Sequence, residues 1–210
     1  MRALPQLACD RVMPLWVARA YGLPPGLGVV RWTWLGATAR AERRRRVWWL
    51  AWSPAEASLP PHIVRHGLVL SVARYLLGVE PGAWDTLAVR EVRQGAARRS
   101  IRGREWARRD REWLRGVSRP DSEWWRSPYP PPTAVEVDAG KVPLDLYRSR
   151  VRGWLRVYDS LLVLVLSRAR GEAWLKLLPD LLVDRPYFRL EVWLLEGWWT
   201  EGARMERLEG

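Results

Sequence analysis

The chain has 210 residues and a formal net charge of +12, with 35 Lys and Arg residues against 23 Asp and Glu residues. This length predicts one compact domain with a modest appendage, large enough to bury a hydrophobic core. The single cysteine, Cys9, excludes an internal disulfide framework and a four-cysteine zinc site.

Arginine accounts for nearly all of the basic residues, because Lys141 and Lys176 are the only lysines. Arginine keeps its charge and presents a planar fork that suits phosphate, so this excess predicts a nucleic-acid partner. A GC-rich coding bias would also favour Arg over Lys. Such a bias does not explain why basic residues outnumber acidic ones.

The sequence predicts no membrane or secretory segment. The N-terminal stretch MRALPQLACD has no apolar core of signal-peptide length. The longest apolar run, LLVLVL at residues 161–166, is far shorter than the roughly 20 residues of a spanning helix. We therefore expect a soluble, cytoplasmic protein without a membrane partner.

The first 53 residues predict a small winged-helix-like unit. Residues 4–22 indicate two short helices broken near Pro14, and the runs VVRWTWLG and RVWWLAWS indicate a β-hairpin with the basic tip ATARAERRRR. On such a wing the run Arg43, Arg44, Arg45 and Arg46 would lie along the phosphate backbone of DNA. The alternative is a solvated loop.

Two helical regions are expected next. The first covers residues 62–77 and carries His66, which would either contact DNA or belong to a polar cluster in the core. The second covers residues 83–116, where Trp106 and Trp113 share one face and are more typical of core anchors than of base-stacking platforms.

The remainder of the chain predicts an α/β domain over residues 54–210. Strands near residues 121–125 and 133–138, joined by a proline-rich turn, would form a hairpin. A helix, a strand, a helix and a strand then follow at residues 144–158, 161–166, 171–178 and 188–195. This alternation implies right-handed crossovers and a largely parallel sheet covered on both faces, with the apolar strand LLVLVL at its centre.

Acidic residues gather where two of these strands would meet. Glu136 and Asp138 are two positions apart, so both side chains point to one face of a strand. Asp121 precedes Glu136 by fifteen residues, enough for a turn and a return along the neighbouring strand. Magnesium prefers oxygen ligands and takes one or two carboxylates with water and phosphate, so the three acids predict a site for Mg²⁺ or Mn²⁺.

Four stretches within residues 60–166 resemble the replication-relaxation family of mobile elements, whose members resemble PD-(D/E)XK, or restriction-endonuclease-like, nucleases. They are LPPHIVRHGLVLSVARYLL, AWDTLAVREVRQ, RPDSEWW, and AVEVDAGK followed by RSRVRGWLRVYDSLLVLV. The resemblance covers about half of the chain, and it depends on the order and spacing of the motifs. It implies a mixed sheet flanked by helices.

Carried over by position, the resemblance implies that Asp121 and Glu136 bind metal and that Glu91 is a further acid from a helix. Asp138 occupies the place where the nuclease pattern has a lysine, and Lys141 follows three residues later. The replication-relaxation pattern tolerates an acid there when a lysine follows a few residues later. The resemblance therefore implies that Lys141 reaches back to the site from the end of the strand. Taken singly, each residue has a simpler structural role, as a turn residue, an arginine partner or a solvated strand end.

Three functions are compatible with the sequence. The first is a metal-dependent DNA endonuclease or nicking accessory of a mobile element. The second is a catalytically inactive DNA-binding accessory for replication or transfer, and either DNA-binding protein could act as a homodimer or within a replication or transfer complex. The third is a viral structural protein, which sixteen tryptophans would suit because aromatic anchors dominate protein interfaces.

Overall fold

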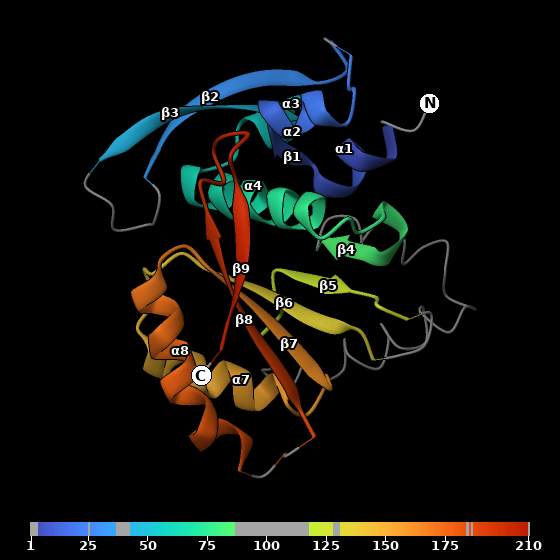
Figure 1. Ribbon diagram of the computed structural model, residues 1–210. Coiled ribbons are helices and arrows are strands. Elements are labelled where there is room, and N and C mark those ends of the chain that lie inside the picture. The colour runs from blue at the N-terminus through green and yellow to red at the C-terminus, as the bar shows by residue number, and fades with distance from the viewer. Residues whose placement is uncertain are drawn as a thin grey trace.

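The structure is a computed structural model that describes residues 4–24, 26–36, 43–86, 118–127, 131–183, 185 and 187–209. Two β-sheets lie one above the other, with helix α4 between them (Figure 1). The helices are α1 (Leu4–Asp10), α2 (Leu15–Ala20), α3 (Pro54–Ala57), α4 (Pro61–Leu76), the 3₁₀ helix η1 (Pro81–Ala83), α7 (Leu144–Trp154) and α8 (Arg168–Leu182).

The smaller sheet belongs to the N-terminal part of the chain. Its three antiparallel strands, in the spatial order β1, β3, β2, are β1 (Val12–Pro14), β3 (Arg44–Ala51) and β2 (Val29–Gly36). The pairing of β2 with β3 confirms the predicted hairpin. A short strand, β1, lies between the two expected helices where only a break near Pro14 was predicted, because Val12, Met13 and Pro14 pair with the end of β3.

The larger sheet has six strands in the order β4, β5, β6, β7, β8, β9. They are β4 (Trp84–Thr86), β5 (Ser122–Trp124), β6 (Thr133–Asp138), β7 (Ser160–Val165), β8 (Arg189–Glu196) and β9 (Arg204–Leu208). Only β6, β7 and β8 are parallel neighbours. The mixed sheet flanked by helices that the resemblance implies is therefore confirmed, whereas the largely parallel sheet expected from the alternation of elements is wrong. Helices α7 and α8 supply the two crossovers, whereas a hairpin places β5 beside β6 and β9 pairs antiparallel with β8.

The two faces of the large sheet pack in two separate hydrophobic cores. Side chains alternate along each strand, so Val135 and Val137 of β6 pack on the α4 side and Ala134 packs on the other side, against α7 and α8. Strand β7 lies at the centre, and its last five residues are fully buried. This confirms the expected position of the apolar strand.

Helix α4 is buried by both sheets, and buried side chains occur on more than one of its faces. Pro61 begins it, and Gly78, with a φ of 62°, follows its last turn in the left-handed conformation that favours glycine. Near its C-terminal end, Arg74 donates two hydrogen bonds, from Nε and Nη2, to the two oxygens of Asp10 at 2.8 and 2.7 Å. This buried pair ties α4 to the end of α1.

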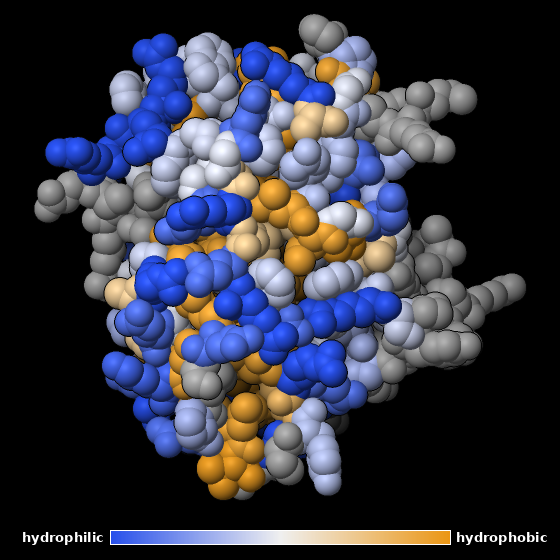
Figure 2. Space-filling view, in the orientation of Figure 1, coloured by the Kyte–Doolittle hydropathy of each residue, from blue (hydrophilic) through white to orange (hydrophobic). Residues whose placement is uncertain are grey.

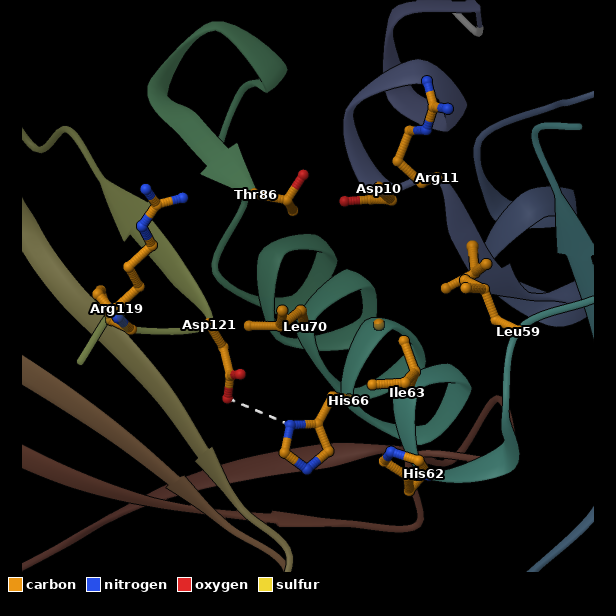
Figure 3. A pocket seen from close by; sticks show the side chains of 13 residues that line it. Asp10, Arg11, Leu59, His62, Ile63, His66, Leu70, Thr86, Arg119 and Asp121 are labelled. Carbon is orange, nitrogen blue, oxygen red and sulfur yellow. Dashed lines mark ion pairs between the residues drawn. The ribbon is translucent and has the colours of Figure 1, made fainter. Parts of the chain in front are cut away.

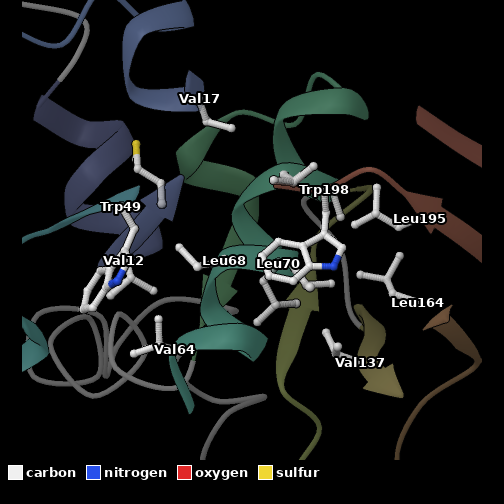
Figure 4. Packing of buried hydrophobic residues seen from close by; sticks show 14 of the residues in the cluster. Val12, Val17, Trp49, Val64, Leu68, Leu70, Val137, Leu164, Leu195 and Trp198 are labelled. Carbon is white, nitrogen blue, oxygen red and sulfur yellow. The ribbon is translucent and has the colours of Figure 1, made fainter. Parts of the chain in front are cut away.

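The turn between β8 and β9 reaches across to the N-terminal part (Figure 1). The backbone carbonyl of Trp198 accepts a hydrogen bond of 3.2 Å from the indole of Trp16, and the guanidinium of Arg45 stacks on Trp199 at 4.3 Å. Residues from both predicted domains therefore share one hydrophobic core (Figure 4). The boundary at residue 53 stays a prediction.

No helix in the described part of the chain has the length and apolar character needed to cross a bilayer.

Candidate functional site

Asp121 and Glu136 meet where β5 begins beside β6. Ser122 pairs with Val135 in this antiparallel register, which brings the preceding residue, Asp121, level with Glu136. The Asp121 backbone N–H donates to Glu136 Oε2 at 3.3 Å, and the Val137 backbone N–H donates to Asp121 Oδ2 at 2.8 Å. The two carboxylates that the sequence predicts to meet are therefore neighbours, each bound to the backbone of the other's segment.

Glu136 is the more buried member of this pair. Only 4% of the residue is exposed, whereas about a quarter of the Asp121 side chain (26%) is exposed. Burial, followed by the neighbouring charge of Asp121, raises the pKa of Glu136 well above its ordinary value, and the positive charge of Arg150 partly opposes that rise. Two acidic side chains thus lie together in one place, which is an arrangement that a bound cation would stabilise.

Arg150 of α7 lies against this acid pair. Its Nη1 atom is 3.4 Å from Glu136 Oε1, and its guanidinium lies over the ring of Tyr147 at 5.3 Å. Arg150 remains 41% exposed, so it can also face a ligand. Sequence reasoning missed this residue. Its place in the helix that directly follows β6 indicated that it could lie near Glu136. The rotation of that helix against the sheet, which decides the contact, cannot be predicted from the sequence.

Asp138 has different partners from Glu136. Both side chains lie on the same face of β6, as predicted, and Asp138 is almost fully buried. Its Oδ2 atom accepts hydrogen bonds from Arg170 Nε at 2.5 Å and Trp174 Nε1 at 2.7 Å, and its Oδ1 atom accepts one from the Gly140 backbone at 2.8 Å. These contacts connect the end of β6 to α8.

The remaining predicted residues have separate locations. Lys141 is exposed and follows the turn at Gly140, which has a φ of 82°. Glu91 lies outside the described residues. Arg43 is exposed just before β3, and Arg44, Arg45 and Arg46 are the exposed first residues of that strand, so three of the four belong to the hairpin strand itself.

His66 approaches Asp121 from α4. Its Nδ1 atom is 3.3 Å from Asp121 Oδ2, and the two side chains point toward one another in Figure 3. The imidazole carries a positive charge toward this carboxylate only when it is protonated. The structure therefore joins His66 to the acid pair, a contact that the sequence did not predict.

A pocket of about 440 Å³ opens beside this contact (Figure 3). Its walls come from the end of α1, from β1, from α4 and the residues before it, from β4 and from the segment that leads into β5. The lining residues are Asp10, Arg11, Val12, Leu59, His62, Ile63, His66, Gly67, Leu70, Thr86, Arg119, Pro120 and Asp121. Asp121 thus lines the pocket together with Arg119 and two histidines, whereas Glu136 is not among the lining residues.

The acid pair provides two carboxylates for a divalent ion. Among the residues that the structure describes, no group of three or more His, Cys, Asp or Glu side chains could hold a metal ion. Magnesium nevertheless binds in many sites through one or two carboxylates, with water and substrate phosphate completing its shell. Asp121 and Glu136 fit that chemistry.

Comparison of the chain with protein-family models, with curated proteins and with solved structures gives no match.

Proposed function

We propose that this chain is a DNA-binding protein of a mobile element that hydrolyses a phosphodiester bond with Mg²⁺ or Mn²⁺ at Asp121 and Glu136. The observation that carries the proposal is the contact between these two acids, one buried with a raised pKa and one open to a pocket. A carboxylate with a strongly raised pKa, in contact with an acid that lines a pocket, is typical of a functional site.

Each side chain near the pair has a role in this proposal. Asp121 and Glu136 would hold the divalent ion, which supplies positive charge to stabilise the negative charge that develops on the phosphate. Arg150 would offset the charge of Glu136 and contact a phosphate oxygen. His66 would fix the orientation of the Asp121 carboxylate, and Arg119 would bind phosphate in the pocket.

The arrangement of the elements supports the nuclease interpretation. A mixed sheet with helices on both faces is compatible with the restriction-endonuclease-like fold that the sequence resemblance implies. The short N-terminal helices and the three strands in the order β1, β3, β2 are compatible with a winged-helix-like unit. The net charge of +12 and the exposed Arg43, Arg44, Arg45 and Arg46 favour binding to the DNA backbone.

A second function, that of an inactive DNA-binding accessory on the same fold, is favoured by one observation. Asp138 stands at the position where the nuclease pattern has a lysine, and its carboxylate is bound to Arg170 and Trp174 of α8. In an inactive protein the acids would serve the structure alone, and DNA binding would be independent of divalent ions.

A nicking assay on supercoiled plasmid separates the two functions. The parent protein is incubated with Mg²⁺, Mn²⁺ or a chelator beside the double variant Asp121→Asn, Glu136→Gln. We expect nicking that requires the divalent ion and falls in the variant by more than the roughly 10- to 100-fold cost of losing an outer-shell partner of a metal site. Asp145→Asn, which changes a carboxylate that is 90% exposed on α7, is the matched control and should nick like the parent.

DNA binding is measured on the same proteins. If parent and double variant bind duplex with equal, salt-sensitive affinity and neither nicks, the hydrolytic proposal is wrong and the accessory function replaces it.

A further inference from the structure

The outward face of the β2–β3 hairpin carries three large aromatic side chains. Trp32 pairs with Trp48 across the two strands, and Trp34, two residues after Trp32, lies on the same face. The exposed fractions of Trp32, Trp34 and Trp48 are 47%, 50% and 47%. These residues form a continuous patch, which we call the tryptophan face.

The opposite face of the same hairpin is well packed. Val47 and Trp49 of β3 are each 3% exposed, and Leu35 of β2 is 1% exposed, within the core that also contains α4. The exposure of the three tryptophans therefore does not come from loose packing of the hairpin on the core. Folded proteins seldom leave large contiguous aromatic patches in water unless the patch binds something.

Positive charge accompanies the tryptophans. Arg46 pairs with Trp34 and lies on the same face, where its guanidinium stacks over Trp32 at 4.8 Å and over Trp34 at 5.8 Å. Arg44 pairs with Gly36 on this face too, and neither strand contains an acidic residue. Figure 2 shows strongly hydrophilic residues at this end of the molecule, as over much of the same face.

We propose that the tryptophan face binds single-stranded DNA, with unpaired bases stacked on Trp32, Trp34 and Trp48 and phosphates held by Arg44 and Arg46. Base stacking on aromatic side chains within a positively charged surface is how proteins bind single strands without sequence preference. In a duplex the faces of the bases are stacked on one another, so the exposed indoles would add nothing to its binding. The arginines supply the charge complementarity that an anionic strand requires.

This inference rests on the proposed function in one respect, which is that the ligand is DNA. It adds that the DNA has an unpaired strand. The tryptophan face shares no residue with the acid pair. An unpaired strand bound there would direct the protein to melted or gapped DNA.

The test measures the affinity of the full chain for a fluorescent oligothymidine and for a duplex of equal length by fluorescence anisotropy. The variant Trp32→Ala, Trp34→Ala should lose roughly 5- to 150-fold in single-strand affinity for each base stack removed, with duplex affinity changed by less than about 2-fold. Trp32→Phe, Trp34→Phe keeps an aromatic ring at both positions and should retain most of the single-strand affinity. Tyr187→Ala removes an aromatic side chain that is 97% exposed elsewhere and should bind like the parent.

Three results would overturn the inference. The first is a parent protein that binds single strands no more tightly than duplex. The second is an alanine variant that loses both affinities equally, or neither. The third is a parent dimer, seen by light scattering, that the alanine variant no longer forms, which would assign the face to self-association. The acid-pair variant should keep full single-strand affinity, so the absence of nicking does not bear on this test.

Discussion

Glu136 and Asp138 show how two acids on one strand face acquire different chemistry. Asp138 accepts hydrogen bonds from three donors, the Gly140 backbone, Arg170 and Trp174. Glu136 faces another carboxylate, Asp121, and is opposed only in part by Arg150. The strand places both residues, but the neighbouring elements decide which groups each carboxylate contacts.

The raised pKa of Glu136 predicts a pH-dependent effect of its removal. With a folded-state pKa above the unfolded value, Glu136 stabilises the fold below its unfolded pKa, and that stability is lost as pH rises through the folded pKa. In chelator, Glu136→Gln should therefore be more stable than the parent at about pH 8, with a smaller difference at about pH 5. Urea unfolding at both pH values measures this.

Asp145→Asn serves as the control for this measurement, because its carboxylate is exposed and its loss should not produce the same pH dependence. A Gln variant that is less stable than the parent at the higher pH, with the difference vanishing at the lower pH, would mean that Glu136 is favoured in its charged form.

Much of the acid pair could be predicted from single residues. Side chains alternate between the two faces of a strand, so Glu136 and Asp138, two residues apart, were expected on one face. The spacing of fifteen residues was enough for a hairpin that brings Asp121 back to Glu136. Arg150, His66 and the partners of Asp138 could not be predicted in this way, because they depend on the rotation and placement of α7, α4 and α8. Sequence spacing within one element does not fix its contacts with another.

At the scale of elements, α4 and β1 approach each other closely at one point. A methyl group added at Gly67 would collide with the side chain of Val12, which is buried and stiff at its branched Cβ. Alanine is normally favoured over glycine inside a helix by about 1 kcal/mol. Here the collision should outweigh that gain, so we expect Gly67→Ala to lower the free energy of unfolding by about 1–3 kcal/mol.

Chemical denaturation checks this expectation, with Gly82→Ala as the matched control. An added methyl group at Gly82 would meet no atom within 4 Å, and this variant should stay within about 0.5 kcal/mol of the parent. A Gly67→Ala protein as stable as the parent would show that α4 and β1 can separate at no cost.

The elements themselves were predicted with uneven success. Long periodic or apolar segments such as α4 and β7 were found within a few residues of their observed ends. The strands β1, β4 and β9 were missed because they are short and owe their conformation to pairing with other strands. Two of the three antiparallel pairs in the large sheet involve these missed strands, and the third is the predicted hairpin of β5 and β6.

At the scale of the whole molecule, the candidate site exists only where four parts of the chain meet. His66 comes from α4, Asp121 from the segment before β5, Glu136 from β6 and Arg150 from α7. The tryptophan face lies on the N-terminal hairpin, which is joined to the same core. In the two proposals, the tryptophan face would bind an unpaired strand, and the acid pair would act on a phosphodiester bond.

Titration of Mn²⁺, followed by electron paramagnetic resonance in the presence of duplex DNA, tests most directly whether Asp121 and Glu136 hold a divalent ion. DNA is included because phosphate oxygens would complete the shell of an ion with two carboxylate ligands. We predict saturable binding to the parent protein that is lost in the variant Asp121→Asn, Glu136→Gln and kept in Asp145→Asn. Equal Mn²⁺ binding by the parent and the double variant would contradict the proposed site.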